Sequence, residues 1–271
     1  MKLLFCGDVV GKSGRRIVEQ YLPLLREKWA LDFVVLNGEN AAHGFGLTPK
    51  FYEEFKKNGV DVITLGNHSF DKKDIIPTLD AQPDIIRPMN YPENTVGKGY
   101  CIYTLASGYR IAVVQLLGQV GMAPVEDPFA VMQSWLKKYV KGRDYEALVV
   151  DFHADATAEK RAMAYFLDGR ALLVAGTHTH IPTADAMVLS KGTGYITDVG
   201  MCGDYASVIG MTEETSITRF LKELKPERFA PAEGPGTFCG IYLDFDEKTL
   251  HINEICPVRI GAHLHNTCNF E

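Results

Sequence analysis

Six near-continuous apolar runs constrain the fold of this 271-residue chain more than any other feature. Each run is short and rich in Val, Ile, Leu and Phe, without clean alternation of apolar and polar residues. Such runs are typical of strands that are covered on both faces. The runs lie at residues 2–7, 33–37, 60–66, 110–118, 147–152 and 171–176.

The segments between the runs carry helix signals. Thr48 is placed to cap a helix that begins at Pro49 and ends before Gly59. Helices are also predicted at 14–30, 128–142 and 157–169. This alternation of strands and helices predicts an α/β architecture with parallel strands.

The helix at 14–30 contains a proline. Pro23 is expected to kink or interrupt it, because proline lacks the amide hydrogen of the helix ladder. The apolar stripe predicted for this helix comprises Ile17, Tyr21, Leu24, Leu25 and Trp29.

The pattern changes after about residue 185. Residues 185–197 predict a hairpin through Lys191 and Gly192, and residues 237–255 predict two antiparallel strands that turn at 246–248. We therefore expect a second, antiparallel-rich sheet late in the chain. With no Ser/Gly-rich linker, low-complexity tract or internal repeat, residues 1–271 are expected to form a single domain.

The net charge and the cysteine pattern limit which partners and which cellular compartment are expected. A net charge of −6 argues against electrostatic, sequence-blind binding to long nucleic acid, although a local cation could still attract a small anionic substrate. The first apolar run reaches Asp8 too early for a signal peptide or a membrane span. None of the six cysteines forms a CxxC pair, so we expect a reduced, cytoplasmic protein with free thiols and no membrane partner.

Polar residues that can bind a metal follow five of the apolar runs. Because the carboxyl ends of parallel strands share one edge of a sheet, these side chains are expected to meet there. In an extended chain, two histidines separated by one residue would also face the same side. Taken singly, each residue has another interpretation, such as a turn cap for Asp8 or a hydrogen-bonded interior imidazole for His153. The residues are Asp8; Glu39 and Asn40; Asn67 and His68; His153; and His178 and His180.

The chemistry of this set indicates which metal site it could form. Carboxylates, amide oxygens and imidazoles without a thiolate suit Mn, Fe or Zn. The set is too large for one ion with open positions and fits two ions bridged by one carboxylate. Two ions about 3.5–4 Å apart are a recurring arrangement for phosphoester hydrolysis.

The blocks around these residues resemble the calcineurin-like metallophosphoesterase superfamily, whose usual blocks are GDxHG, GDxxDRG, GNHE and GHxH. Val10 stands where the first block has its histidine, and Glu39-Asn40 stands where the second has its bridging aspartate. These departures match the YmdB-like family of bacterial 2′,3′-cyclic-nucleotide phosphodiesterases. The matching blocks are GDVVGKSGRR, VLNGENAAHGFG, TLGNHSFDKKDI, RPMNYP, VDFHADATAEK, GTHTHIPTAD and, in part, ITDVGMCGDYASVIG.

The resemblance, which covers nearly the whole chain, implies an αββα sandwich of two packed mixed sheets flanked by helices. It further implies two metal ions, Fe or Mn and alternatively Zn, a small 2′,3′-cyclic nucleotide as substrate, and a homodimer or homotetramer. His68 would act as the general acid rather than as a ligand. One ion would be held by Asp8, Glu39, Asn40 and His180, and the other by Glu39, Asn67, His153 and His178, with Glu39 bridging.

The implied reaction is attack of a metal-bridging hydroxide on phosphorus while His68 protonates the departing ribose oxygen. Alternatively, His68 only orients a ligand. The same metal site would also serve a phosphomonoesterase such as a nucleotidase, or a regulatory or RNA-associated protein with little turnover.

Several further residues are weaker site candidates. His43 could line a nucleotide pocket or be a solvated loop residue, and Arg87 could contact phosphate, although a structural salt bridge is favoured. The spacing of His263, His265 and Cys268 imitates a metal site but has no partner carboxylate, so these three are excluded.

Overall fold

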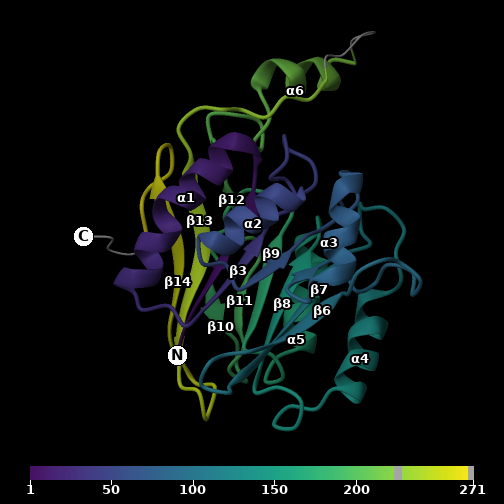
Figure 1. Cartoon of the computed structure of the whole chain (residues 1–271), viewed down its shortest axis with the longest axis vertical. Helices are drawn as coiled ribbons and strands as arrows, with labels where there is room; N and C mark the ends of the chain where they lie inside the picture. The colour runs from purple at the N-terminus through teal and green to yellow at the C-terminus, as the bar shows by residue number, and fades with distance from the viewer. Residues whose placement is uncertain (223–227, 268–271) are drawn as a thin grey trace.

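The computed structural model describes residues 1–222 and 228–267. Within this part, two six-stranded mixed sheets pack face to face (Figure 1). In spatial order, the first sheet contains β14 (Ile252–Gly261), β13 (Thr237–Phe245), β1 (Lys2–Cys6), β3 (Phe33–Asn37), β4 (Val62–Thr64) and β5 (Ile85–Ile86). The second contains β10 (Met187–Val188), β11 (Gly194–Ile196), β9 (Leu173–Thr177), β8 (Ala147–His153), β7 (Arg110–Leu117) and β6 (Tyr100–Thr104).

Helices cover the outer face of each sheet, and a small strand pair joins two loops. The parallel strands β2 (Asp8–Val9) and β12 (Met201–Cys202) bring the segment after β1 against the segment that precedes the last helix. That helix, α6 (Glu213–Phe220), lies beyond the strand ends at the top of Figure 1. The helices are α1 (Gly11–Lys28), α2 (Pro49–Lys57), α3 (Ile76–Ala81), preceded by the 3-10 turn η1 (Lys73–Ile75), α4 (Pro128–Lys138), α5 (Thr157–Phe166) and α6 (Glu213–Phe220).

Three apolar layers hold these elements together. Leu4 and Cys6 of β1 face a core shared with α1 and α2, whereas Leu3 and Phe5 face a core between the two sheets. The third core lies between the second sheet and helices α4 and α5, with Trp135 among its members. Strand β1 therefore buries both of its faces, whereas the edge strands β10 and β14 keep exposed residues. The expected αββα sandwich is confirmed.

The expectation of a separate antiparallel sheet late in the chain is wrong. Both predicted hairpins form, but β13 pairs antiparallel with β1, and the β10–β11 hairpin extends the second sheet through β9. The reason is burial, because β13 is buried on both faces and needs a packed layer on each side. The parallel strands are also divided, with β1, β3 and β4 in the first sheet and β8 and β9 in the second, so the expectation that the polar strand ends share one sheet edge is wrong.

Pro23 does not interrupt the first helix, so that part of the expectation is wrong. Helix α1 continues through Pro23, which is exposed, as is Glu19 four residues earlier. Water can therefore reach the carbonyl that loses its helix partner. The buried stripe of this helix is rotated from the predicted one, since Leu24 is 51% exposed while Val18 and Leu22 are buried.

The cap predicted at Thr48 is confirmed. Its side chain accepts a hydrogen bond from the Phe51 amide, and Gly59 adopts a left-handed φ of 92° after the helix end. The prediction of free thiols holds for the buried residues Cys6, Cys101, Cys202 and Cys239. It is wrong for Cys256, which is disulfide-bonded.

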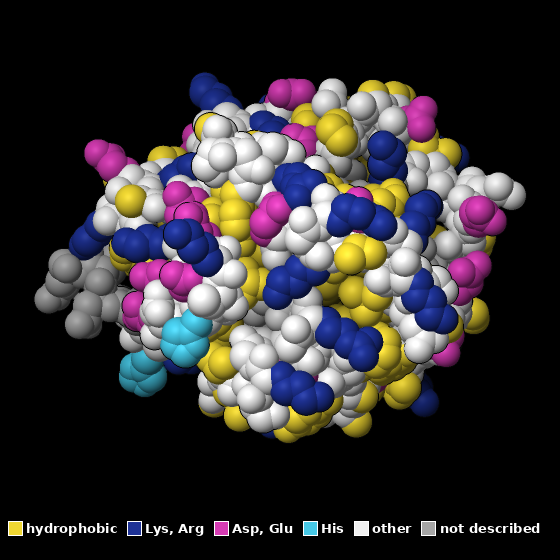
Figure 2. Space-filling view, turned by 90° about the horizontal axis from the view of Figure 1, so that it is seen from below, with side chains coloured by type: hydrophobic (Ala, Val, Ile, Leu, Met, Phe, Trp, Pro, Cys, Tyr) yellow, Lys and Arg dark blue, Asp and Glu magenta, His cyan; other side chains and the backbone are white. Residues whose placement is uncertain are grey.

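Two surface properties bear on partners. Among the described residues, no helix combines the length and the apolar character needed to cross a membrane. The negative net charge is unevenly distributed, because the face seen from below in Figure 2 carries Lys and Arg side chains over much of its centre. Net charge alone therefore describes the individual faces of this molecule poorly.

Candidate metal centre

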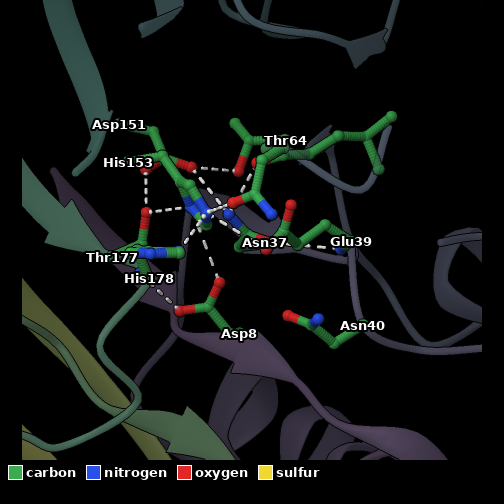
Figure 3. A network of polar contacts seen from close by, with 12 residues as sticks. Asp8, Asn37, Glu39, Asn40, Thr64, Asp151, His153, Thr177 and His178 are labelled. Carbon is green, nitrogen blue, oxygen red and sulfur yellow. Dashed lines mark hydrogen bonds and ion pairs between the residues drawn. The ribbon is translucent and has the colours of Figure 1, made fainter. Parts of the chain in front are cut away.

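The predicted ligands lie at the carboxyl ends of strands from both sheets. Figure 3 shows five of them gathered together, namely Asp8, Glu39, Asn40, His153 and His178. From the first sheet, Asp8 follows β1, Glu39 and Asn40 follow β3, and Asn67 follows β4. From the second sheet, His153 ends β8, and His178 and His180 follow β9. The centre thus lies at the seam between the sheets.

The two histidines after β9 are not in an extended chain, contrary to the expectation from their spacing. His178 and His180 have φ values of 96° and 66°, both in the left-handed region. This conformation costs a non-glycine residue roughly 1–3 kcal/mol and persists only where surrounding contacts hold it. The two imidazoles are therefore directed by a strained loop rather than by strand pleating.

His153 Nε2 lies at the centre of one group of ligand atoms. It is 3.0 Å from each of Glu39 Oε1, Asn67 Oδ1 and His178 Nδ1. A ring nitrogen carries at most one proton, so it cannot form hydrogen bonds with all three of these atoms at once. The ligand atoms of Glu39, His153 and His178 all lie within 4.8 Å of one another, a separation that fits a shared cation.

Asp8 and Asn40 supply a second observation that fits a cation. Asp8 Oδ1 and Asn40 Oδ1 are buried and have no hydrogen-bond partner among the described residues. Their other polar atoms are fixed, because Asp8 Oδ2 accepts from the His178 amide at 3.2 Å and Asn40 Nδ2 donates to the Gly44 carbonyl at 2.9 Å. A buried acceptor without a partner costs about 1–3 kcal/mol, which a bound cation would offset.

His180 is oriented in the manner of a metal-ligating imidazole. Its Nδ1 donates to the Ile209 carbonyl at 2.7 Å, which leaves Nε2 available as a ligand. Burial lowers the pKa of His180, and burial together with the charge of His153 lowers the pKa of His178 to about 3. Both imidazoles are therefore neutral, which is the form that binds metal.

Without metal, the negative charge of the centre is balanced by a proton on His153. Burial lowers the pKa of His153, but the charge and hydrogen bond of Glu39 and the charge of Asp8 outweigh it and raise this pKa. Burial raises the pKa of Glu39, yet the charge and hydrogen bond of His153 lower it overall. Burial also raises the pKa of Asp8 well above its usual range. A positive charge is thus needed where these groups meet.

His68 stands apart from the ligand atoms although it follows Asn67 directly. Its amide donates to Glu39 Oε2 at 2.9 Å, and its Nδ1 lies 2.8 Å from Asp71 Oδ2. The ring packs edge-on against Phe45, with centroids 5.0 Å apart, and lines the cleft beside the centre. This position agrees with a role separate from that of Asn67.

Comparison with known proteins places the chain in a family. The family model described as YmdB-like protein matches residues 4–258. The chain belongs to the YmdB-like family. A 2′,3′-cyclic-nucleotide 2′-phosphodiesterase of Bacillus subtilis (strain 168) is 47% identical over 249 residues, which cover 92% of this chain and 93% of the relative.

Two solved structures share the fold of this YmdB-like protein closely. A protein of Thermus thermophilus superimposes with a TM-score of 0.89 at 41% identity, covering 96% of this chain and 99% of the other. A phosphatase of Mycoplasma pneumoniae has a TM-score of 0.89 at 36% identity, covering 96% of this chain and 93% of the other.

A buried hydrogen-bond chain beneath His153 escaped the sequence analysis of this YmdB-like protein. Nδ1 of His153 lies 2.9 Å from Thr177 Oγ1, which donates to Asp151 Oδ1 at 2.6 Å. Asp151 also accepts hydrogen bonds from Asn37, Thr64 and Gln115. These polar residues within apolar runs were the available signal, and they fix which His153 nitrogen faces the ligands.

A second missed residue holds the histidine loop. Asp198 accepts hydrogen bonds from both the amide and the hydroxyl of Thr179, at 3.0 and 2.7 Å, and from the Gly200 amide at 2.9 Å. Thr179 lies between His178 and His180. Asp198 therefore fixes the residue that separates the two strained histidines.

The remaining candidates lie outside the centre. His43 is exposed, and Arg87 donates to the carbonyls of Val96, Pro88 and Thr95, so the favoured salt bridge of Arg87 is not formed within the described residues. The expectation that the terminal histidines have no partner carboxylate is wrong for His263, because its Nε2 lies 3.6 Å from Asp204 Oδ1. Cys268 lies outside the described residues.

Proposed function

We propose that this YmdB-like protein is a metal-dependent phosphodiesterase that hydrolyses small cyclic nucleotides of the 2′,3′ type. Two observations carry the proposal: the cluster of ligand atoms from Glu39, His153 and His178, and the buried oxygens of Asp8 and Asn40 that lack hydrogen-bond partners among the described residues. Glu39 and Asn40 line a cleft that His68 also lines. The naming of the Bacillus subtilis relative as a phosphodiesterase supports the reaction class.

The residues fit two ions per chain. Glu39, Asn67, His153 and His178 would hold one ion, and Asp8, Asn40 and His180 would hold the other together with Glu39. The mixed oxygen and nitrogen set suits iron or manganese, with zinc as the alternative. When bound, the ions would neutralise phosphate charge and lower the pKa of water toward neutrality.

The protein's own contribution to bond cleavage is a proton. Opening of a 2′,3′-cyclic phosphate releases a ribose oxygen, which is a poor leaving group until it is protonated. With Nδ1 of His68 engaged by Asp71, Nε2 is the nitrogen that we expect to donate this proton. A positioned general acid contributes roughly 10²–10⁴-fold to the rate.

A substrate panel tests the proposal. Protein reconstituted with manganese, iron or zinc is assayed on 2′,3′-cyclic nucleotides, 3′,5′-cyclic nucleotides and nucleoside monophosphates. We expect metal-dependent opening of the 2′,3′-cyclic substrates. Turnover of monophosphates alone would instead indicate a nucleotidase, a class that the phosphatase name of the Mycoplasma pneumoniae structure keeps open. Absence of turnover on all three groups would overturn the enzymatic proposal.

A further inference from the structure

The cleft beside the metal centre has two chemically different ends. Its volume is about 220 Å³. Glu39, Asn40, His178 and His180 line the metal end. The other end is lined mainly by apolar side chains from three separate segments, and none of its described lining residues carries a formal charge. These residues are Phe45, Val208, Ile209, Met211, Ser216, Phe220 and Phe229.

His68 lies between the two ends. Its amide contacts Glu39 of the metal end, while its ring contacts Phe45. Phe45 in turn lies against Phe229, with ring centroids 6.2 Å apart. A nucleoside 2′,3′-cyclic phosphate presents the same order of groups, with phosphate first, the departing ribose oxygen next and the base last.

Ser216 supplies an independent observation. Its side chain is only 3% exposed and lines the apolar end, yet Oγ has no hydrogen-bond partner among residues 1–222 and 228–267. A serine within a helix commonly bonds to a carbonyl one turn earlier, but Ser216 does not do so here. A buried hydroxyl without a partner is costly unless a ligand satisfies it.

The aromatic ring of Phe229 is itself held in place. Arg219 lies on α6, close in sequence to Ser216. Its guanidinium carbon is 3.8 Å from the centroid of the Phe229 ring. Such cation–π contact orients the ring and leaves one face for another partner. An uncharged aromatic end with one unsatisfied hydroxyl suits a flat, neutral ligand group that has a polar edge.

We infer that this apolar end is a nucleobase subsite, in which Phe45 and Phe229 contact the base and Ser216 hydrogen-bonds its edge. The inference rests on the proposed function, because the phosphate at the metal centre sets where the base lies. Since a hydroxyl both donates and accepts, the subsite takes purines and pyrimidines, with the larger purine surface favoured.

The test compares two substrates that differ only in the base. One is 2′,3′-cyclic AMP, and the other is methyl ribofuranoside 2′,3′-cyclic phosphate, which keeps the reacting groups. For Phe45→Ala, the ratio of their kcat/KM values should fall roughly 5- to 150-fold, as expected for one lost stacking contact. For Ser216→Ala it should fall roughly 2- to 10-fold, without loss of folding because no protein hydrogen bond is removed.

Three further variants separate base binding from structural damage. Phe45→Tyr keeps the ring and should restore the ratio, whereas Phe45→Leu should not. Tyr165→Ala serves as the control, because Tyr165 is an exposed aromatic residue on α5 that lies outside the cleft lining. An unchanged ratio in both Phe45→Ala and Ser216→Ala, or equal losses on the two substrates, would overturn the subsite.

Failure of the proposed function gives a different result. If the wild-type protein hydrolyses neither substrate, calorimetric titration of the metal-loaded protein with 2′,3′-cyclic AMP still tests the subsite. Binding that weakens in Phe45→Ala and Ser216→Ala but not in Tyr165→Ala would support it. Failure of the wild-type protein to bind this nucleotide at millimolar concentration would overturn it.

Discussion

The ammonium group of Lys160 lies 2.8 Å from Oδ2 of Asp198, and both side chains are almost completely buried. The same Asp198 oxygen accepts two hydrogen bonds from Thr179, the residue between His178 and His180. Helix α5 thus reaches through an ion pair to the loop that directs both histidines. The pair compensates the charge of a carboxylate that holds a strained segment of backbone.

Replacement of Lys160 should therefore damage both stability and metal binding. Lys160→Met leaves Asp198 charged, buried and without its cation, and we expect unfolding to become easier by roughly 3–5 kcal/mol. Metal content should fall because the histidine loop loses its support. The control is Arg161→Met, which removes a neighbouring, partly exposed ion pair with Asp185 and should cost about 1 kcal/mol or less. Denaturant unfolding and elemental analysis measure both effects, and equal behaviour of the two variants would refute this role.

Glu39 is the carboxylate that we expect to bridge the two ions. Glu39→Gln should lower the metal content from about two ions per chain toward zero, because both sites lose a charged ligand. His180→Ala should remove about one ion, since it affects one site. Metal analysis after reconstitution without chelator distinguishes these outcomes. Retention of full metal content in Glu39→Gln would show that the bridging assignment is wrong.

Replacement of His68 should slow the departure of the leaving group without reducing the metal content. His68→Gln keeps a polar side chain but cannot donate a proton at a useful pKa. We expect both metals to remain and turnover of cyclic nucleotides to fall roughly 10²–10⁴-fold. The loss should shrink for a p-nitrophenyl ester, whose leaving group departs without a proton. Equal losses on the two substrates would indicate a positioning role, and loss of metal would make His68 a ligand.

The sequence indicated where polar residues end strands but not how the strands are distributed between sheets. Asp8 and His153 each follow or end an apolar run, and this local pattern survives whichever sheet the strand joins. The pairing of β13 with β1 joins segments more than 230 residues apart and depends on packing between layers, which no local pattern encodes. The sandwich could nevertheless be predicted, because the sequence blocks resemble a known family.

The supporting residues of the centre were harder to predict than its ligands. Asp151 lies inside β8, and Asp198 follows the short strand β11, which lies in the predicted hairpin and not among the six apolar runs. Both act through a threonine, Asp198 through Thr179 and Asp151 through Thr177. The left-handed backbone at His178 and His180 was also missed, because β-strand periodicity assumes that the strand continues. Hydrogen bonds to Asp198 and to the Ile209 carbonyl hold this loop, and both partners lie outside the strand that precedes it.

Removal of metal should destabilise the protein by an amount that grows as pH rises from about 6.5 to 9. Burial lowers the pKa of His153, but the negative charges of Glu39, Asp8 and Asp151 raise it to about 9 in the metal-free protein. Because the pKa of His153 is higher in the folded protein than in the unfolded chain, its protonation stabilises the fold. This stability is fully present below the pKa of the unfolded chain and is lost as pH rises through the folded-state pKa. Metal must displace this proton, so its binding strengthens over the same window. Thermal unfolding of chelated and reloaded protein should show a widening gap in Tm, and His43→Ala, at an exposed loop histidine, should leave that gap unchanged. A gap independent of pH would exclude proton displacement at His153.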